Sequence, residues 1–113
     1  MSNHKFQSCI TACSECAVEC KSCATSCLSE QDIKMCVRCI KLDHDCAAIC
    51  LLAMEAMASG SEFVKQICKL CAEICNACAV ECEKHSHMDH CKKCAEACRT
   101  CAEECKNMVL QYA

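Results

Sequence analysis

The hydrophobic and polar positions of this chain repeat with the period of an α-helix, but the residue on the apolar stripe is cysteine. The fifteen-residue pattern C-x-x-C-A-x-x-C-x-x-C-A-x-x-C occurs at Cys13–Cys27, Cys68–Cys82 and Cys91–Cys105. A fourth copy, Cys36–Cys50, carries Ile40 for the first Ala and Asp43 for the middle Cys. Alternating steps of three and four residues place these side chains on one helix face. The pattern therefore predicts four helices, each lined with thiols on one face.

The spacing of the four copies predicts their arrangement. They begin at residues 13, 36, 68 and 91, so each of the first two is followed by a counterpart 55 residues later, as in a duplicated helical hairpin. Short links make neighbouring helices antiparallel. We expect an all-α fold, an up-down-up-down antiparallel four-helix bundle with a Cys-lined core, as a single domain over residues 1–113. The helices are expected at about 4–28, 31–58, 62–84 and 87–111.

Local signals suggest where these helices begin and end. Gly60, the only glycine, is a natural stop for the second helix. Ser61 is then placed to cap the third helix. The segment 86–89, Ser-His-Met-Asp, has the form of a capping box that opens the fourth helix.

Heptad labels put every cysteine at position a or d, including Cys9, one step before the first copy. The Ala after each d-position Cys falls at e: Ala17, Ala24, Ala47, Ala72, Ala79, Ala95 and Ala102. Small residues beside the seam let helices approach closely enough for thiols of different helices to share an ion. A few cysteines on such a seam would be explained by packing alone, because free Cys behaves as a small hydrophobe. Twenty cysteines on the seam indicate metal ligands.

Composition supports a metal-stabilised domain. The 113 residues include 20 Cys but only 19 Leu, Ile, Val and Phe together, so few large apolar side chains are available for a hydrophobic core. Small domains of this kind usually need disulfides or metal. The N-terminal segment lacks the apolar stretch of a secretory signal, and no apolar run is long enough to span a membrane. We therefore expect a cytoplasmic protein, in which thiols stay reduced and act as ligands. The net charge is −3 and the charged residues are spread evenly along the chain, so we expect no nucleic-acid partner.

The choice of metal follows from charge and geometry. Thiolates select Cu(I), Zn(II) or iron–sulfur clusters. Four thiolates on one Zn(II) leave a charge of −2, so about five such sites would bury roughly ten charges at great cost. Cu(I) matched one-to-one with thiolate leaves no net charge, and it accepts two or three sulfurs. The chain has no Pro and no C-x-x-C-x-x-C run, which disfavours a cluster protein.

The two ends of the predicted seam differ in chemistry. Where the chain termini lie, the seam continues with apolar side chains, and we call this the apolar end: Phe6, Ala53, Met57, Val64, Met108 and Tyr112. The opposite end, which we call the histidine end, carries Glu30, Asp32, His85 and His87, with Met35 and His90 alongside. Carboxylates near helix starts and histidines in loops are common without metal. We nevertheless expect copper to enter at the histidine end.

Helices built from C-x-x-C-A-x-x-C, four per chain and without an export signal, resemble the cytosolic copper storage proteins of bacteria. The resemblance covers nearly the whole chain. It implies a four-helix bundle filled with Cu(I) and assembled as a homotetramer. We expect copper ions as the cargo and a copper chaperone as donor or acceptor. Carried over by motif, the Cu(I) ligands are Cys9, Cys13, Cys16, Cys20, Cys23, Cys27, Cys36, Cys39, Cys46, Cys50, Cys68, Cys71, Cys75, Cys78, Cys82, Cys91, Cys94, Cys98, Cys101 and Cys105. His85, His87 and His90 resemble the family's metal-access ligands.

The chain departs from the repeat at Asp43, where the pattern predicts Cys. Three roles for Asp43 remain open: a weak ligand, a protonated core residue, or a gap in the string of copper ions. The next residue, His44, falls at position b and is expected to face outward as a surface residue.

These observations lead to one hypothesis with two alternatives. The chain is expected to store and detoxify copper, with roughly twenty Cu(I) ions per chain, at one per thiolate. No Ser/His/Asp or Cys/His arrangement stands apart from the thiols, so no enzymatic activity is expected. The alternatives are a general thiol-rich protein that sequesters Zn, Cd or Hg, and a redox-active disulfide module. Zinc would saturate near five ions, and a disulfide protein would bind none.

Overall fold

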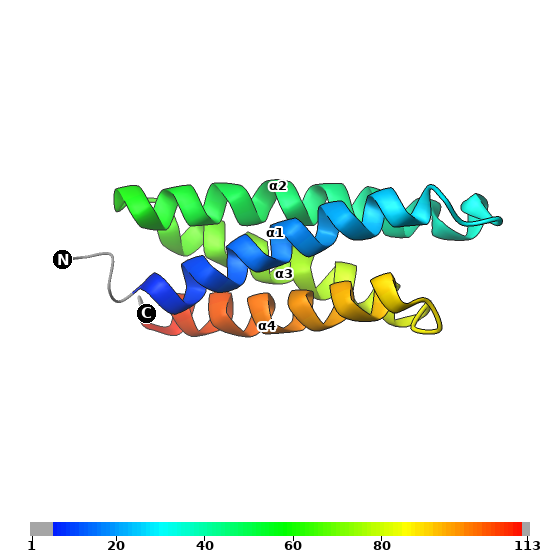
Figure 1. Cartoon of the computed structure of the whole chain (residues 1–113). Coiled ribbons are helices and arrows are strands. Elements are labelled where there is room, and N and C mark those ends of the chain that lie inside the picture. The colour runs from blue at the N-terminus through cyan, green and yellow to red at the C-terminus, as the bar shows by residue number, and fades with distance from the viewer. Residues whose placement is uncertain (1–5, 112–113) are drawn as a thin grey trace.

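The structure, a computed structural model, describes residues 6–111. Its elements, in chain order, are α1 (Gln7–Cys27), the short 3₁₀ helix η2 (Ile33–Cys36), α2 (Val37–Ser59), α3 (Val64–Glu83) and α4 (Asp89–Gln111) (Figure 1). The described residues contain no strand. The expected start of the first helix near residue 4, and Tyr112 of the apolar end, lie outside the described residues.

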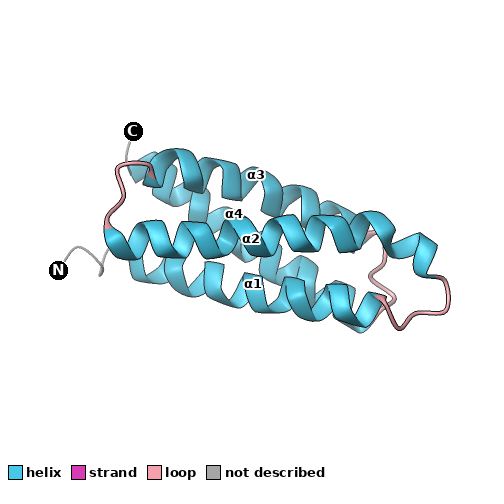
Figure 2. Cartoon of the chain, turned by 90° about the horizontal axis from the view of Figure 1, so that it is seen from above, coloured by secondary structure: helices cyan, strands magenta, loops and turns pink. Residues whose placement is uncertain are grey.

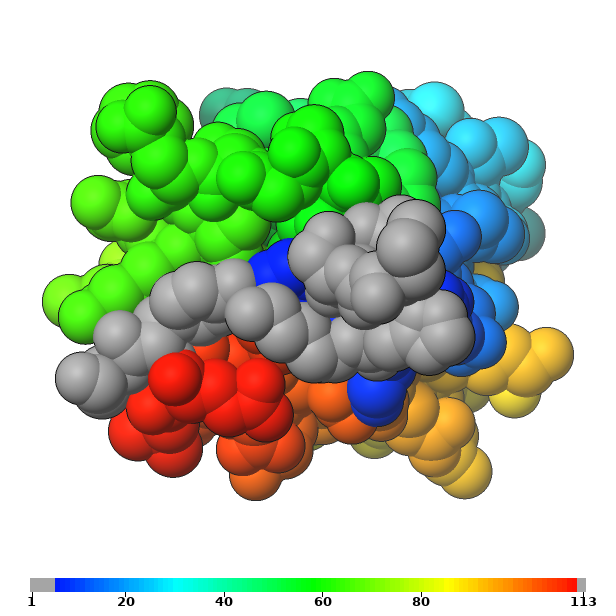
Figure 3. Space-filling view, turned by 90° about the vertical axis from the view of Figure 1, so that its left-hand side faces the viewer, coloured from blue at the N-terminus to red at the C-terminus, as the bar shows by residue number. Residues whose placement is uncertain are grey.

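The four long helices form an antiparallel bundle with dimensions of 48 × 19 × 18 Å. Each of them packs against two neighbours: α1 and α3 both contact α2 and α4. The α1–α2 and α3–α4 links lie at one end, and the α2–α3 link lies at the other with the chain termini (Figures 1 and 2). Figure 3 looks onto that second end, with the α2–α3 link in green and the last turns of α4 in red. The predicted up-down-up-down four-helix bundle is confirmed.

The predicted end of α2 is confirmed, but its predicted start is wrong. Gly60 adopts the left-handed conformation, with φ of 68°. Its N–H bonds to the Met57 carbonyl, and the Ser61 N–H bonds to the Ala56 carbonyl at 2.9 Å, the paired bonds of a Schellman motif. At the other end, Asp32 has a non-helical backbone (φ −105°, ψ 75°) and 3₁₀ helix η2 precedes α2. The α-helix therefore begins at residue 37 instead of near 31.

Both serine caps expected from the sequence are wrong by two or three residues. The Ser61 Oγ accepts the Phe63 N–H at 3.0 Å, which closes the turn before α3, while the helix itself begins at Val64. Ser86 lies in a turn, and α4 begins only at Asp89. Asp89 places its carboxylate in the first turn of α4, where the helix dipole favours negative charge. The sequence signals marked the correct links but not the residues at which the helices begin.

The core follows the heptad prediction. All twenty cysteines are buried, with exposed fractions of 1% or less. The alanines at position e are buried as well, so the helices approach closely along the seam. Large buried apolar side chains lie at the apolar end, namely Phe6, Met57, Val64 and Met108, while Ile49 and Met88 are buried elsewhere. No helix among residues 6–111 has the length and apolar character required to cross a membrane.

Candidate metal centre

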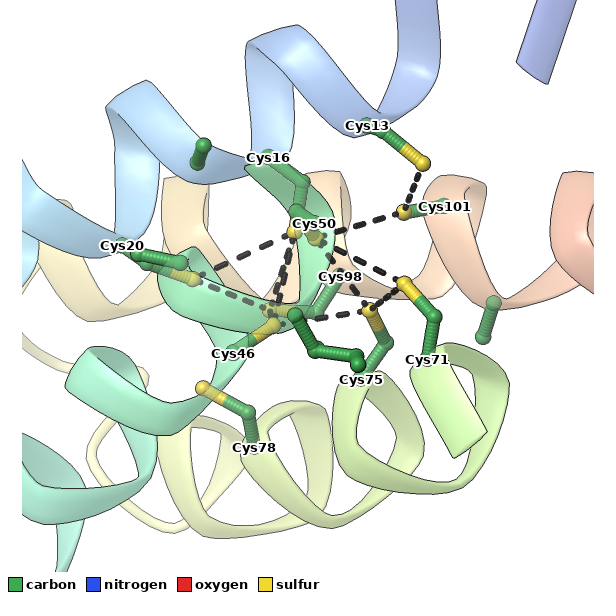
Figure 4. Close-up of a cluster of buried hydrophobic side chains, with 14 of the residues drawn as sticks. Cys13, Cys16, Cys20, Cys46, Cys50, Cys71, Cys75, Cys78, Cys98 and Cys101 are labelled. Atoms are coloured by element: carbon green, nitrogen blue, oxygen red, sulfur yellow. Dashed lines mark hydrogen bonds between the residues drawn. The ribbon is translucent and has the colours of Figure 1, made fainter. Parts of the chain in front are cut away.

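The sulfur atoms in the core lie in contact across the helices. Figure 4 shows thiols from α1, α2, α3 and α4 directed toward one another around the bundle axis. The Cys46 and Cys75 sulfurs are 3.4 Å apart, and those of Cys39 and Cys82 are 3.5 Å apart. All twenty cysteines are free thiols. Because a metal–thiolate bond is about 2.3 Å long, one ion can bridge sulfurs at these separations.

The thiols form overlapping sets of four, each with its ligand atoms within 4.8 Å of one another. Examples with sulfur ligands only are Cys13/Cys71/Cys101/Cys105, Cys16/Cys46/Cys50/Cys75, Cys16/Cys20/Cys46/Cys98 and Cys20/Cys78/Cys94/Cys98. Neighbouring sets share members, such as Cys16 and Cys20. The core is therefore a continuous array in which a thiolate can bridge adjacent ions, rather than a few isolated sites.

Burial raises the pKa of some thiols at the end of this array, so that they hold their protons when no metal is present. Burial first, and the neighbouring Cys39 second, raise the pKa of Cys91 to about 12. Burial likewise raises the pKa of Cys27 well above that of an exposed thiol. A metal ion must displace these protons, because the thiolate is the ligand. A monovalent cation that replaces one proton leaves the core uncharged, which avoids the cost of burying unpaired charge.

Asp43 occupies the place of the missing cysteine and is fully buried. Its Oδ1 accepts hydrogen bonds from Cys78 at 3.1 Å and from Cys94 at 3.3 Å. Burial raises the pKa of Asp43 to about 11. Of the three roles left open by the sequence, this geometry favours a protonated carboxyl in the core of the metal-free protein.

At the histidine end, His90 faces the thiols. Its Nδ1 lies 3.6 Å from the sulfurs of both Cys23 and Cys91, and 3.9 Å from that of Cys27. Together these four side chains form a mixed nitrogen and sulfur set. The opposite ring nitrogen, Nε2, lies 3.0 Å from Glu30 Oε2. The structure thus brings one of the three predicted histidines to the outermost thiols.

The other two histidines have different surroundings. His85 is buried, and its Nε2 lies 3.2 Å from Glu81 Oε2. The other oxygen of Glu81 pairs with Arg38 at 3.2 Å and with Lys84 at 3.3 Å. Although burial of Glu81 acts in the opposite direction, the bonds from His85 and Lys84 lower the pKa of its carboxyl. His87 is exposed, with its ring centroid 6.5 Å from that of His85. Their metal ligation remains a prediction.

Glu81, whose carboxylate contacts the His85 ring, was not identified from the sequence. The signal available was its spacing, since residues four apart on a helix face each other. His44 was expected on the surface and is exposed there, with its Nδ1 3.0 Å from the Lys21 Nζ.

Comparison with known proteins gives consistent findings. A family model described as Csp, copper storage protein, matches residues 2–110. YhjQ of Bacillus subtilis strain 168, described as an uncharacterized cysteine-rich protein, is 52% identical over 84 residues, which are 74% of this chain and 77% of YhjQ. The structure of the Cu(I)-bound copper storage protein BsCsp3 is 50% identical, with a TM-score of 0.88 over 92% of this chain and 97% of that one. A cytosolic copper storage protein from Streptomyces lividans, solved with five coppers, is 34% identical, with a TM-score of 0.91 over 96% of this chain and 95% of that one.

Proposed function

The chain belongs to the copper storage protein family, and we propose that it stores Cu(I) inside its helix bundle at roughly one ion per thiol. The observation that carries this proposal is the continuous array of twenty buried, free thiols drawn from four helices. Such an array has far more ligands than one structural site needs. Storage would also lower the free copper concentration and so protect the cell.

Cu(I) suits this core better than a divalent ion does. Each Cu(I) replaces one proton, whereas a tetrathiolate Zn(II) site retains a charge of −2. Burial raises the pKa of Cys91 to about 12, which supports the view that negative charge is unfavourable in its surroundings. The Cu(I)-bound and copper-loaded relatives support the same choice. Sequestration of Zn, Cd or Hg remains the alternative for the test below.

The test is an anaerobic titration of the reduced protein with Cu(I) in the presence of a chromogenic Cu(I) chelator. We expect no copper on the chelator until around twenty equivalents per chain, one for each Cys. A break near five would favour tetrathiolate sites instead. Replacing Cys46 and Cys75 with Ser should lower the capacity by about two ions. Met57→Leu, which removes a buried sulfur outside the thiol array, should leave the capacity unchanged.

We further propose that the protein acts in the cytosol as a homotetramer without catalytic activity. The Streptomyces lividans relative is described as cytosolic, which supports the location. Large apolar side chains remain exposed on the outer helix faces, including Val18 at 65%, Leu52 at 47% and Leu70 at 47%, and burial between chains would remove them from water. Light scattering coupled to gel filtration tests this assembly, and a mass of one chain would contradict it.

We propose the histidine end as the route of copper into the core. His90 touches the outermost thiols there, whereas Phe6, Met57 and Val64 fill the apolar end. His85 and His87 would supply nitrogen ligands along this route, and a copper chaperone would deliver or collect copper there. Replacing all three histidines with Ala should slow loading and leave the capacity nearly unchanged. Loading at the wild-type rate would contradict this route.

A further inference from the structure

We propose that Glu30 is a positioning residue for copper uptake, because its carboxylate sets the ring of His90 so that Nδ1 faces the thiols. This inference rests on the proposed function and adds a residue to it. The inference rests on the position of the His90 ring between Glu30 and Cys23. Its Nε2 contacts the Glu30 carboxylate, and its Nδ1 faces the Cys23 sulfur.

Glu30 is itself held in place by the backbone. It lies in the α1–α2 link, and its N–H donates to the Cys27 carbonyl at 3.1 Å. Its carboxylate lies beside α4, where Oε2 is 3.0 Å from His90 Nε2. The His90 side chain is 19% exposed and that of Glu30 is 36% exposed, so the pair borders on solvent. His90 therefore lies between the solvent and the outermost thiols.

The hydrogen bond selects one form of the imidazole ring. A carboxylate can only accept, so the Nε2 of His90 is the donor to Glu30. In the neutral ring the proton is then on Nε2, and Nδ1 keeps its lone pair. Nδ1 lies 3.6 Å from the sulfurs of Cys23 and Cys91. The free lone pair and the two sulfurs thus converge on one region at the border of the core.

Copper uptake at this point is a ligand exchange without electron transfer. Cu(I) forms bonds to Nδ1 and to a sulfur of Cys23 or Cys91, and the thiol proton leaves to water. The ligand that carried Cu(I) to the protein is released. With the other tautomer, Nδ1 would carry a hydrogen and could not coordinate. Outer carboxylates fix metal-binding histidines in this way in other proteins.

The first test reads the tautomer directly in the reduced, metal-free protein. Long-range ¹H–¹⁵N correlation spectra of the His90 ring should show hydrogen on Nε2 in the wild type. Glu30→Ala and Glu30→Leu remove the acceptor and should give a mixture of tautomers. Glu30→Gln retains an acceptor oxygen and should keep hydrogen on Nε2. An unchanged His90 spectrum in both Glu30→Ala and Glu30→Leu would overturn the proposal.

The second test measures the rate at which the protein takes Cu(I) from a chromogenic Cu(I) chelator complex. Loss of an outer partner commonly costs about tenfold or more, so Glu30→Ala should load roughly tenfold more slowly. Its final capacity should equal that of the wild type. Glu62→Ala, which removes an exposed carboxylate in the α2–α3 link, matches the change in charge and should load at the wild-type rate. Slowing of the same size in Glu62→Ala would overturn the specific role of Glu30.

A double-mutant cycle separates positioning from simple attraction of a cation. If Glu30 acts through His90, then Glu30→Ala should add no further slowing to His90→Ala. Undiminished slowing in that background would show that Glu30 acts by its own charge, which contradicts the proposal. A wild-type protein that takes up no Cu(I) would instead contradict the proposed function. If Glu30→Ala keeps the wild-type loading rate, capacity and His90 tautomer, the role of Glu30 is rejected and the proposed function stands.

Discussion

Replacing Asp43 with Asn should make the stability of the reduced, metal-free protein less dependent on pH. Burial raises the pKa of Asp43 to about 11 in the folded protein. The same carboxyl has a pKa of about 3.9 in an unfolded chain. At neutral pH the unfolded chain carries the carboxylate, and folding requires the uptake of one proton.

The sign of the effect follows from this proton. Because the pKa of Asp43 is higher in the folded than in the unfolded state, its contribution to stability is fully present below about pH 4. That contribution is lost progressively as the pH rises toward the folded-state pKa of about 11. Each pH unit in this window changes the free energy of unfolding by about 1.4 kcal/mol. From pH 5 to pH 7 the loss is about 2.7 kcal/mol, a large part of the roughly 5–15 kcal/mol of a typical domain.

Urea titrations at pH 5, 6 and 7, with reductant and chelator present, measure the effect. Asn has nearly the shape of Asp and keeps an oxygen that accepts from Cys78 and Cys94, but it cannot ionise. Contributions from all groups that the two proteins share cancel in the difference. The wild type should lose about 2.7 kcal/mol more than the variant, a midpoint shift of about 1–3 M in urea. Parallel pH profiles would refute the neutral, buried carboxyl.

The reduced, metal-free protein should show a mostly helical far-UV circular dichroism spectrum, because Cys and Ala pack as small apolar residues; a random-coil spectrum would mean that metal drives folding. Cu(I) loading should release about one proton per ion, followed with a pH indicator, because the raised pKa of thiols such as Cys91 keeps them protonated beforehand. Loading without proton release would contradict that reasoning. Met57→Leu with Met108→Leu should leave the loading rate unchanged, and a slower rate would move copper access to the apolar end.

The bundle and its thiol core were predictable because the cysteine spacing admits one helical arrangement. Steps of three and four residues place Cys and the following Ala on one face, and the structure buries that face along all four helices. The helix starts were predicted less well, since Ser61 and Ser86 fit capping patterns that the links do not use. Local sequence identifies a capping residue but does not fix the backbone angles of the link around it.

The different surroundings of His85 and His90 could not be predicted from the sequence. His85 and His90 both lie near the end of a cysteine copy, and nothing in their spacing separates them. The structure distinguishes them by their carboxylate partners. His85 contacts Glu81, four residues earlier in the sequence, whereas His90 contacts Glu30, 60 residues earlier. The pair between Glu30 and His90 depends on the packing of α1 against α4, which a local pattern does not encode.

The same packing supports the proposed entry of copper at the histidine end. A cation that leaves water must find a new ligand before it loses the last one, because an unligated ion in an apolar interior is very costly. At the histidine end, Glu30 at the solvent border holds His90, whose Nδ1 lies 3.6 Å from the sulfur of Cys23. On the proposed route Cu(I) passes from this nitrogen to the thiols, which are softer donors, so the ion gains affinity as it moves inward. At the apolar end, Phe6 and Val64 offer no such ligand and Met57 offers only a thioether sulfur, so we expect copper to enter at the histidine end.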